Sequence, residues 1–240
     1  MNEQQQQLAA RVADIRRRMH DACIRAGRAP ESVLLCAASK TRDVQTVQNA
    51  QNIGIDLFGE NRVQELVEKH AANAYGTTPL HFIGHLQTNK VRQVVGVADL
   101  IESVDSLHLL EAIEKEAARQ NLVQSILIEV NIAGEESKSG ISPDELFSLL
   151  KTADSLSHIQ VKGLMCIPPR CEEPEEQRHW FSLMHTLFNK AAAKSWQTNQ
   201  MQILSMGMSG DFETAIQEGA TIVRVGTAIF GPRIYPVPTV

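Results

Sequence analysis

Short apolar runs alternate along the chain with stretches whose apolar residues recur every three or four positions. The short runs lack the apolar–polar alternation of a half-exposed strand, which is typical of parallel strands buried on both faces. We expect eight such strands, at 33–40, 55–58, 80–83, 100–104, 125–132, 161–167, 202–206 and 221–225. The intervening stretches have the period of amphipathic helices, for example at 44–53 and 88–97.

Signals for helix ends agree with this alternation. Ser106 is a natural N-cap, and 142–145 reads as a capping box with Pro143 at the first helical position. An additional helix precedes the first strand, with an apolar stripe that ends before Gly27 and consists of Leu8, Val12, Ile15, Met19 and Cys23. Eight strand–helix units in 240 residues predict an α/β fold, a single (β/α)8 TIM barrel with an extra N-terminal helix, as one domain over 1–240. A doubly wound open sheet is the alternative, but eight near-regular units favour closure.

Composition narrows the function classes. The net charge of -5 and the lack of a basic stripe argue against nucleic-acid binding. Four cysteines without a CxxC pair suit a reducing compartment and argue against a disulfide framework or a zinc site. No signal peptide or membrane-length apolar segment is evident, so we expect a cytoplasmic protein. His81 and His85 could share a strand face as metal ligands, yet no third ligand is evident, and we expect no metal.

Lys40 ends the first expected strand, at the rim where barrel proteins place their chemistry. Partial shielding from water favours the neutral amine and lowers its pKa from about 10.4 toward the range in which lysine attacks a carbonyl. The alternative is a solvated lysine that only marks the end of the strand. Other strands bring further polar residues to this rim: Glu60, Asn61, His85, Ser103, Asp105, Asn131 and Arg224.

The loops after the last two strands predict an anion site. Gly207 to Gly210 bring glycines and the Ser209 hydroxyl to a helix start, where free N–H groups and the helix dipole bind anions. Gly226 and Thr227 can present further N–H groups to the same point, which is the common phosphate site of this fold. The alternative is that Ser209 only caps its helix and Gly226 only makes a turn.

A barrel closes its eighth strand onto its first, so Lys40 and this phosphate cradle would be neighbours. That arrangement suits a phosphorylated aldehyde held as a Schiff base, either pyridoxal phosphate or a sugar phosphate. Arg224 favours the first, because arginine stays protonated and can only donate hydrogen bonds. Facing a pyridine nitrogen, it would keep that nitrogen unprotonated.

Seven motifs cover the chain from the first strand to Gly231: SKT (39–41), FGENRVQE (58–65), HFIGHLQTNK (81–90), EVNIAGEESKSG (129–140), GLMCIPP (163–169), LSMGMSGDFETAI (204–216) and VRVGTAIFG (223–231). Together they resemble the pyridoxal phosphate homeostasis protein family, whose barrel is that of fold-type III proteins and of the N-terminal domain of alanine racemase. The resemblance implies that Lys40 carries pyridoxal 5'-phosphate as a Schiff base and that Arg224 faces the ring nitrogen. It also implies that Ser209, Gly226 and Thr227 hold the phosphate, and that Asn61 lies near the ring.

The family further implies reversible storage of the cofactor and its delivery to apoenzymes. Catalysis is disfavoured, because Arg224 opposes a protonated ring nitrogen and racemisation usually needs two bases. In alanine racemase the second base is a tyrosine of the partner subunit's additional β-domain. This chain has Tyr75, which we expect at the opposite end of the barrel, and Tyr235 in the tail. A missing base typically forfeits about 10²–10⁴-fold in rate.

We therefore expect a cofactor-binding protein, monomeric and without evident catalysis. The alternatives are a weak pyridoxal phosphate-dependent, racemase-like enzyme and a class I aldolase that uses the same lysine on a sugar phosphate. Lys138, in the loop after the fifth strand, is interpreted as a solvated loop lysine.

Overall fold

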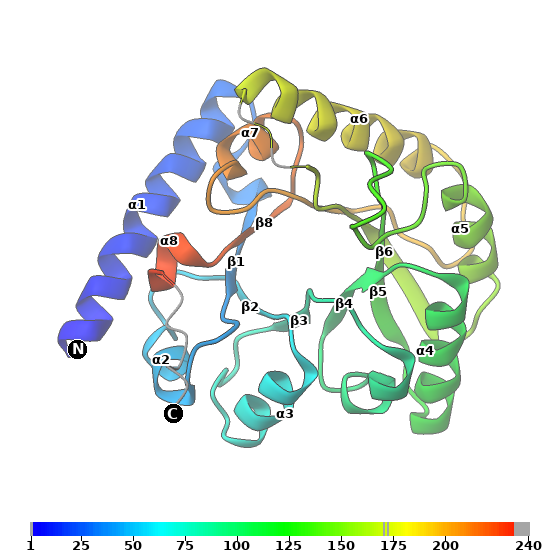
Figure 1. Cartoon of the computed structure of the whole chain (residues 1–240), viewed down its shortest axis with the longest axis horizontal. Helices are drawn as coiled ribbons and strands as arrows, with labels where there is room; N and C mark the ends of the chain where they lie inside the picture. The colour runs from blue at the N-terminus through cyan, green and yellow to red at the C-terminus, as the bar shows by residue number, and fades with distance from the viewer. Residues whose placement is uncertain (1, 170, 172, 233–240) are drawn as a thin grey trace.

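In the computed structural model, which describes residues 2–169, 171 and 173–232, eight parallel strands close into a barrel in sequence order (Figure 1). The last strand pairs with the first, so the sheet has no open edge. This confirms the predicted (β/α)8 barrel. The strands are β1 Leu34–Ala38, β2 Leu57–Glu60, β3 Leu80–Phe82, β4 Leu100–Val104, β5 Gln124–Glu129, β6 Ile159–Met165, β7 Ile203–Ser205 and β8 Ile222–Val225.

Helices and short 3-10 turns surround the barrel as an outer layer (Figure 1). They are α1 Glu3–Arg25, η1 Pro30–Ser32, α2 Val44–Asn49, α3 Val63–Ala71, η2 Thr88–Gln93, α4 Leu107–Gln120, α5 Leu146–Asp154, α6 Pro174–Ala192, α7 Phe212–Gln217 and α8 Thr227–Phe230. The helix α1 is the extra N-terminal one. It buries the predicted stripe and lies along α7 and α8. Within the described part of the chain, no helix combines the length and the apolar character that crossing a bilayer requires.

Along each strand, side chains point alternately outward to the helices and inward to the barrel lumen. The larger core lies between the barrel wall and the helices and includes Phe58 of β2. The barrel lumen is filled by smaller clusters, one of which contains Leu57 of β2 with Cys36 and Ala38 of β1. Because successive strand residues point to opposite faces, Glu60 follows Phe58 onto the helix side. The carboxylate of Glu60 therefore lies behind the barrel wall and not in its mouth.

Several local predictions differ from the structure, and most strand bounds are shifted by one to three residues, so that β1 ends at Ala38 and Lys40 lies in the turn after it. The region 88–97 forms only the short 3-10 helix η2, and Gly96, with φ of +76°, lies in the turns that follow it. The capping box at 142–145 is half formed, because the Glu145 carboxylate accepts the Ser142 N–H at 3.1 Å while α5 begins only at Leu146. The strand expected at 55–58 is shifted to Leu57–Glu60.

Candidate functional site

The carboxyl-terminal ends of β1 and β8 lie side by side, as the sequence predicts. Ala37 pairs with Val225, and a Cβ added to Gly226 would lie 3.2 Å from the Ala38 carbonyl oxygen. The two chains then diverge, one into the turn that carries Lys40 and the other into α8. The turn that carries Lys40 and the loop that carries Gly226 therefore start next to each other, at the paired ends of β1 and β8.

The loops after β7 and β8 meet at Ser209. Its hydroxyl oxygen accepts the N–H of Gly226 at 3.2 Å and the N–H of Ala228 at 3.4 Å. The N-cap residue of α7 is Asp211, two positions later, so the hydroxyl bridges the two loops and is not the cap of that helix. Gly207 allows the first loop to turn, because it has φ of +93° and an added Cβ would lie 2.5 Å from the Ala215 Cβ. Thr227 is exposed at the start of α8.

Arg224 lies inside the barrel and is almost fully buried. Its guanidinium donates to the Ser205 hydroxyl at 2.6 Å and to the Cys166 carbonyl at 2.8 Å, and it lies 3.8 Å from the Glu102 carboxylate. Ser205 in turn donates to Glu102 at 2.6 Å. The other Glu102 oxygen lies 2.6 Å from His81 Nδ1. Side chains of β3, β4 and β7 thus fix the position of a buried cation on β8.

The charge of Glu102 is stabilised within this chain of contacts. Burial acts to raise the pKa of its carboxyl, but the hydrogen bond and charge of His81 and the charge of Arg224 outweigh that effect, and the pKa lies below its ordinary value. Sequence reasoning missed Glu102 and Ser205 as partners of Arg224. Ser205 lies on β7, next to β8, whereas Glu102 lies on β4, which does not pair with β8, so these contacts across the lumen are visible only once the barrel is closed and its register is known.

Asn61 follows β2 directly, at the same end of the barrel, and is partly buried. Its side-chain oxygen is buried and has no hydrogen-bond partner within the described residues. A buried acceptor without a donor typically costs about 1–3 kcal/mol. An unmatched acceptor at the mouth of a barrel fits a residue that meets a ligand.

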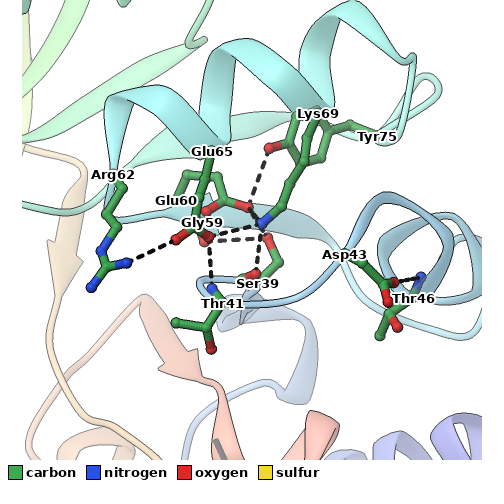
Figure 2. A network of polar contacts seen from close by, with 10 residues as sticks. All are labelled: Ser39, Thr41, Asp43, Thr46, Gly59, Glu60, Arg62, Glu65, Lys69 and Tyr75. Carbon is green, nitrogen blue, oxygen red and sulfur yellow. Dashed lines mark hydrogen bonds and ion pairs between the residues drawn. The ribbon is translucent and has the colours of Figure 1, made fainter. Parts of the chain in front are cut away.

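The turn that carries Lys40 is held from the helix side of the barrel wall (Figure 2). Ser39, before the lysine, is fully buried, and its hydroxyl donates to Glu60 at 2.5 Å. Thr41, after the lysine, donates its N–H to Glu65 at 2.6 Å. Lys69 links the two sides, with its amine 2.9 Å from the Ser39 carbonyl, 2.8 Å from Glu60 and 3.2 Å from Glu65. Lys40 itself is partly buried.

Tyr75 belongs to the same cluster and corrects one expectation. Its backbone precedes β3, yet its hydroxyl donates to Glu60 at 3.2 Å, near the carboxyl end of β2. Its ring packs on Phe58, with 5.4 Å between the ring centroids. The backbone of Tyr75 is at the expected end of the barrel, but its long side chain reaches toward the other end. Its hydroxyl lies beside Glu60, behind the barrel wall. Tyr235, the other tyrosine, lies outside the described residues.

Two further carboxylates lie at the carboxyl ends of the strands, Glu129 at the end of β5 and Asp105 directly after β4. Glu129 is nearly buried, and desolvation, with a smaller contribution from the charge of Asp105, raises the pKa of its carboxyl to about 7. Asp105 accepts a contact from the exposed His85 at 3.1 Å. The backbone carbonyl of Lys138 accepts from Asn131 at 3.4 Å, so the loop after β5 is held at its base. In the described ranges, no group of three or more His, Cys, Asp and Glu side chains is placed to hold a metal ion.

Comparison with known proteins gives the same fold and supplies relatives of similar length. Residues 5–234 match the family model described as "Alanine racemase, N-terminal domain". A protein of Aquifex aeolicus named pyridoxal phosphate homeostasis protein is 43% identical over 225 residues, which cover 94% of this chain and 98% of that protein.

Two solved structures are similar over nearly their full length. One is an unknown protein from Bifidobacterium adolescentis, with a TM-score of 0.87, 36% identity and coverage of 96% of this chain and 97% of that one. The other is PipY of Synechococcus elongatus with pyridoxal phosphate bound, with a TM-score of 0.81, 32% identity and coverage of 93% of this chain and 100% of that one.

Proposed function

The chain belongs to the pyridoxal phosphate homeostasis protein family, and we propose that it binds pyridoxal 5'-phosphate reversibly on Lys40 and limits the free concentration of the cofactor. The observation that carries this proposal is the pairing of β1 with β8, which places the Lys40 turn beside Gly226, the residue whose N–H donates to Ser209. When bound, the cofactor supplies an aldehyde that condenses with a lysine amine to a Schiff base and water.

The residues present suit that cofactor. The N–H groups of Gly226 and Ala228 both point at the Ser209 hydroxyl oxygen, which joins the two loops, and we propose that Ser209, Gly226 and Thr227 hold the phosphate at this junction. Arg224 offers a donor-only cation from the barrel interior, and we assign it to the ring nitrogen. The unmatched oxygen of Asn61 provides an acceptor near the ring. These groups come from the carboxyl ends of β2, β7 and β8, at the same rim.

We propose storage and transfer in preference to catalysis. Arg224 is held by Ser205 and Glu102, so it would keep a ring nitrogen that it faces unprotonated and weaken the electron sink that racemisation requires. The Tyr75 hydroxyl is bonded to Glu60 behind the wall, where it cannot act as a base in the mouth. Incubation of the loaded protein with alanine in deuterated water should give α-proton exchange no faster than free cofactor gives; faster exchange would favour the weak racemase-like alternative.

The proposed setting is the cytoplasm, with the protein acting as a monomer that passes its cofactor to apoenzymes. The four cysteines are free, three of them buried, which suits a reducing compartment. Burial raises the pKa of the Cys166 thiol to about 12, so that thiol stays protonated and unreactive. Mixing the loaded protein with an apoenzyme and following the gain of enzyme activity tests delivery.

The covalent site can be tested directly. The protein is titrated with pyridoxal 5'-phosphate while its visible absorption is recorded, and the complex is then reduced with borohydride and digested. Modification of the peptide that contains Lys40, with loss of the absorption change in Lys40→Ala, supports the proposal. A Lys40→Ala variant with unchanged affinity and colour would remove the role of this lysine.

A further inference from the structure

The backbone around Lys40 is held in a specific turn. The N–H of Arg42 donates to the Ser39 carbonyl at 3.1 Å, which closes a four-residue turn with Lys40 at its second position. Thr41, at the third position, has φ of +63°, a left-handed conformation that β-branched residues rarely adopt. Such a conformation persists only where the surroundings impose it.

The surroundings that impose it come from β2 and α3 (Figure 2). Before the lysine, Ser39 is bonded through its hydroxyl to Glu60 and through its carbonyl to Lys69. After the lysine, the Thr41 N–H is bonded to Glu65. Lys69 also contacts both carboxylates, so the two attachments form one connected cluster.

Burial of these three charged side chains costs free energy that a purely structural role does not require. Glu60 and Lys69 are 0% and 3% exposed, and Glu65 retains 19% exposure. Buried ion pairs roughly break even against well-packed apolar side chains of the same volume, so they are weak evidence for stability, and in some proteins their role is to impose a specific geometry. The geometry imposed here is that of the two residues that flank Lys40.

We propose that Glu60, Glu65 and Lys69 are positioning residues that aim the Lys40 side chain at the aldehyde of the cofactor by fixing Ser39 and Thr41. This inference rests on the proposed function, because it assumes attachment of pyridoxal 5'-phosphate to Lys40. In that attachment the neutral amine forms a C=N bond to the aldehyde carbon, and the carbonyl oxygen leaves as water with the two amine protons. The contacts of the three residues reach Ser39 and Thr41 on either side of the lysine, so we expect them to act through the shape of this turn.

Glu65 offers the cleanest substitution, since it is the least buried of the three. Glu65→Ala removes the acceptor of the Thr41 N–H, whereas Glu65→Gln keeps an oxygen in place to accept it. The matched control is Glu114→Ala. Glu114 lies on α4, is 20% exposed, and accepts the backbone N–H of His158 at 3.0 Å before β6, at the opposite end of the barrel.

Two measurements distinguish the orientation of Lys40 from the affinity of the pocket for the cofactor. The rate of attachment is followed by timed borohydride reduction and quantification of the modified peptide that contains Lys40. Affinity for pyridoxine 5'-phosphate, which has an alcohol in place of the aldehyde, reports the phosphate and ring contacts alone. We expect Glu65→Ala to slow attachment about tenfold, because small misplacements of a reacting group are costly. We expect it to change the affinity for pyridoxine 5'-phosphate less than about twofold, and Glu65→Gln to recover most of the rate.

The outcomes are distinct. Wild-type protein that never attaches the cofactor to Lys40 would defeat the proposed function itself. Attachment at the wild-type rate in Glu65→Ala, or an equal slowing in Glu114→Ala, would overturn the positioning role alone. An equal loss of pyridoxine 5'-phosphate affinity would also overturn it, since the defect would then lie in the whole pocket. If Glu65→Ala does not fold, Ser39→Ala tests the other flank with the same two measurements, and an unchanged attachment rate there refutes the inference.

Discussion

Substitution of Lys69 by methionine should destabilise the protein strongly. The amine has three oxygen partners, and its removal leaves the carboxylate of Glu60, 0% exposed, without its cation. Removal of one partner of a buried pair typically costs about 3–5 kcal/mol. With an unfolding entropy of about 2.1 cal/mol/K per residue, or about 0.5 kcal/mol/K for 240 residues, the melting temperature should fall by about 6–10 °C.

The assay is thermal unfolding of the ligand-free protein, followed by circular dichroism. Lys115→Met is the matched control, because Lys115 is exposed on α4 and its loss should change the melting temperature by no more than about 1 °C. The double variant Glu60→Gln/Lys69→Met should recover part of the loss, since no buried charge is left without its partner.

The loss should also depend on pH. Burial already raises the pKa of Glu60 in the folded protein, against the opposing charge of Lys69, and without that charge the pKa rises further. A folded-state carboxyl with a raised pKa loses stability as pH rises above its unfolded pKa, so the deficit of Lys69→Met should be smaller at pH 5 than at pH 8. A melting temperature within 2 °C of wild type at pH 8 would refute the reasoning.

Three further variants test other parts of the molecule. Gly163→Ala should fail to fold or lose several degrees in melting temperature, because the added Cβ would lie 1.8 Å from the Ile203 carbonyl oxygen on the neighbouring strand; normal unfolding would contradict the register of β6 and β7. Ser209→Ala should raise the dissociation constant for pyridoxine 5'-phosphate about tenfold, since one hydrogen bond to a charged group is lost, and should leave the binding of unphosphorylated pyridoxine unchanged. Equal effects on both ligands would exclude Ser209 from the phosphate site. The pKa of Glu129 is raised from 4.5 to about 7, so the wild type loses about 3 kcal/mol of folding stability as pH rises through that window. Glu129→Gln should therefore melt about 5–7 °C higher than the wild type at pH 8 but at the same temperature at pH 4. An equal difference at both pH values would exclude titration of Glu129 as its cause.

The sequence predicts the barrel because its evidence is repeated. Eight short apolar runs and the stripe of α1 each require only the local period of the chain, and all eight strands form. The rim follows from the same argument, since parallel strands end at one face. The sequence alone therefore predicts that Lys40 and the loops of Ser209 and Gly226 lie together. Their roles toward the cofactor, and the single domain over 1–240, stay predictions.

The cluster behind Lys40 could not be predicted in this way. On α3 the periodicity predicts an apolar face of Val63, Leu66, Val67 and His70. The structure buries the first two, but it buries Lys69 as well and leaves Val67 40% exposed. A helical lysine is ordinarily solvated, and its inward turn is decided by Glu60, whose side chain faces the helices only because of the strand register. The one local signal is the spacing of Glu65 and Lys69, which also fits an ordinary surface pair.

We propose above that Lys40 holds pyridoxal 5'-phosphate as a Schiff base. The most direct test of this proposal is borohydride reduction of the wild-type complex at one equivalent of cofactor, followed by mass spectrometry of the digested protein. We expect modification of the peptide that contains Lys40 and of no other lysine at comparable yield. Modification that falls mainly on another lysine, or no modification at all, would contradict it.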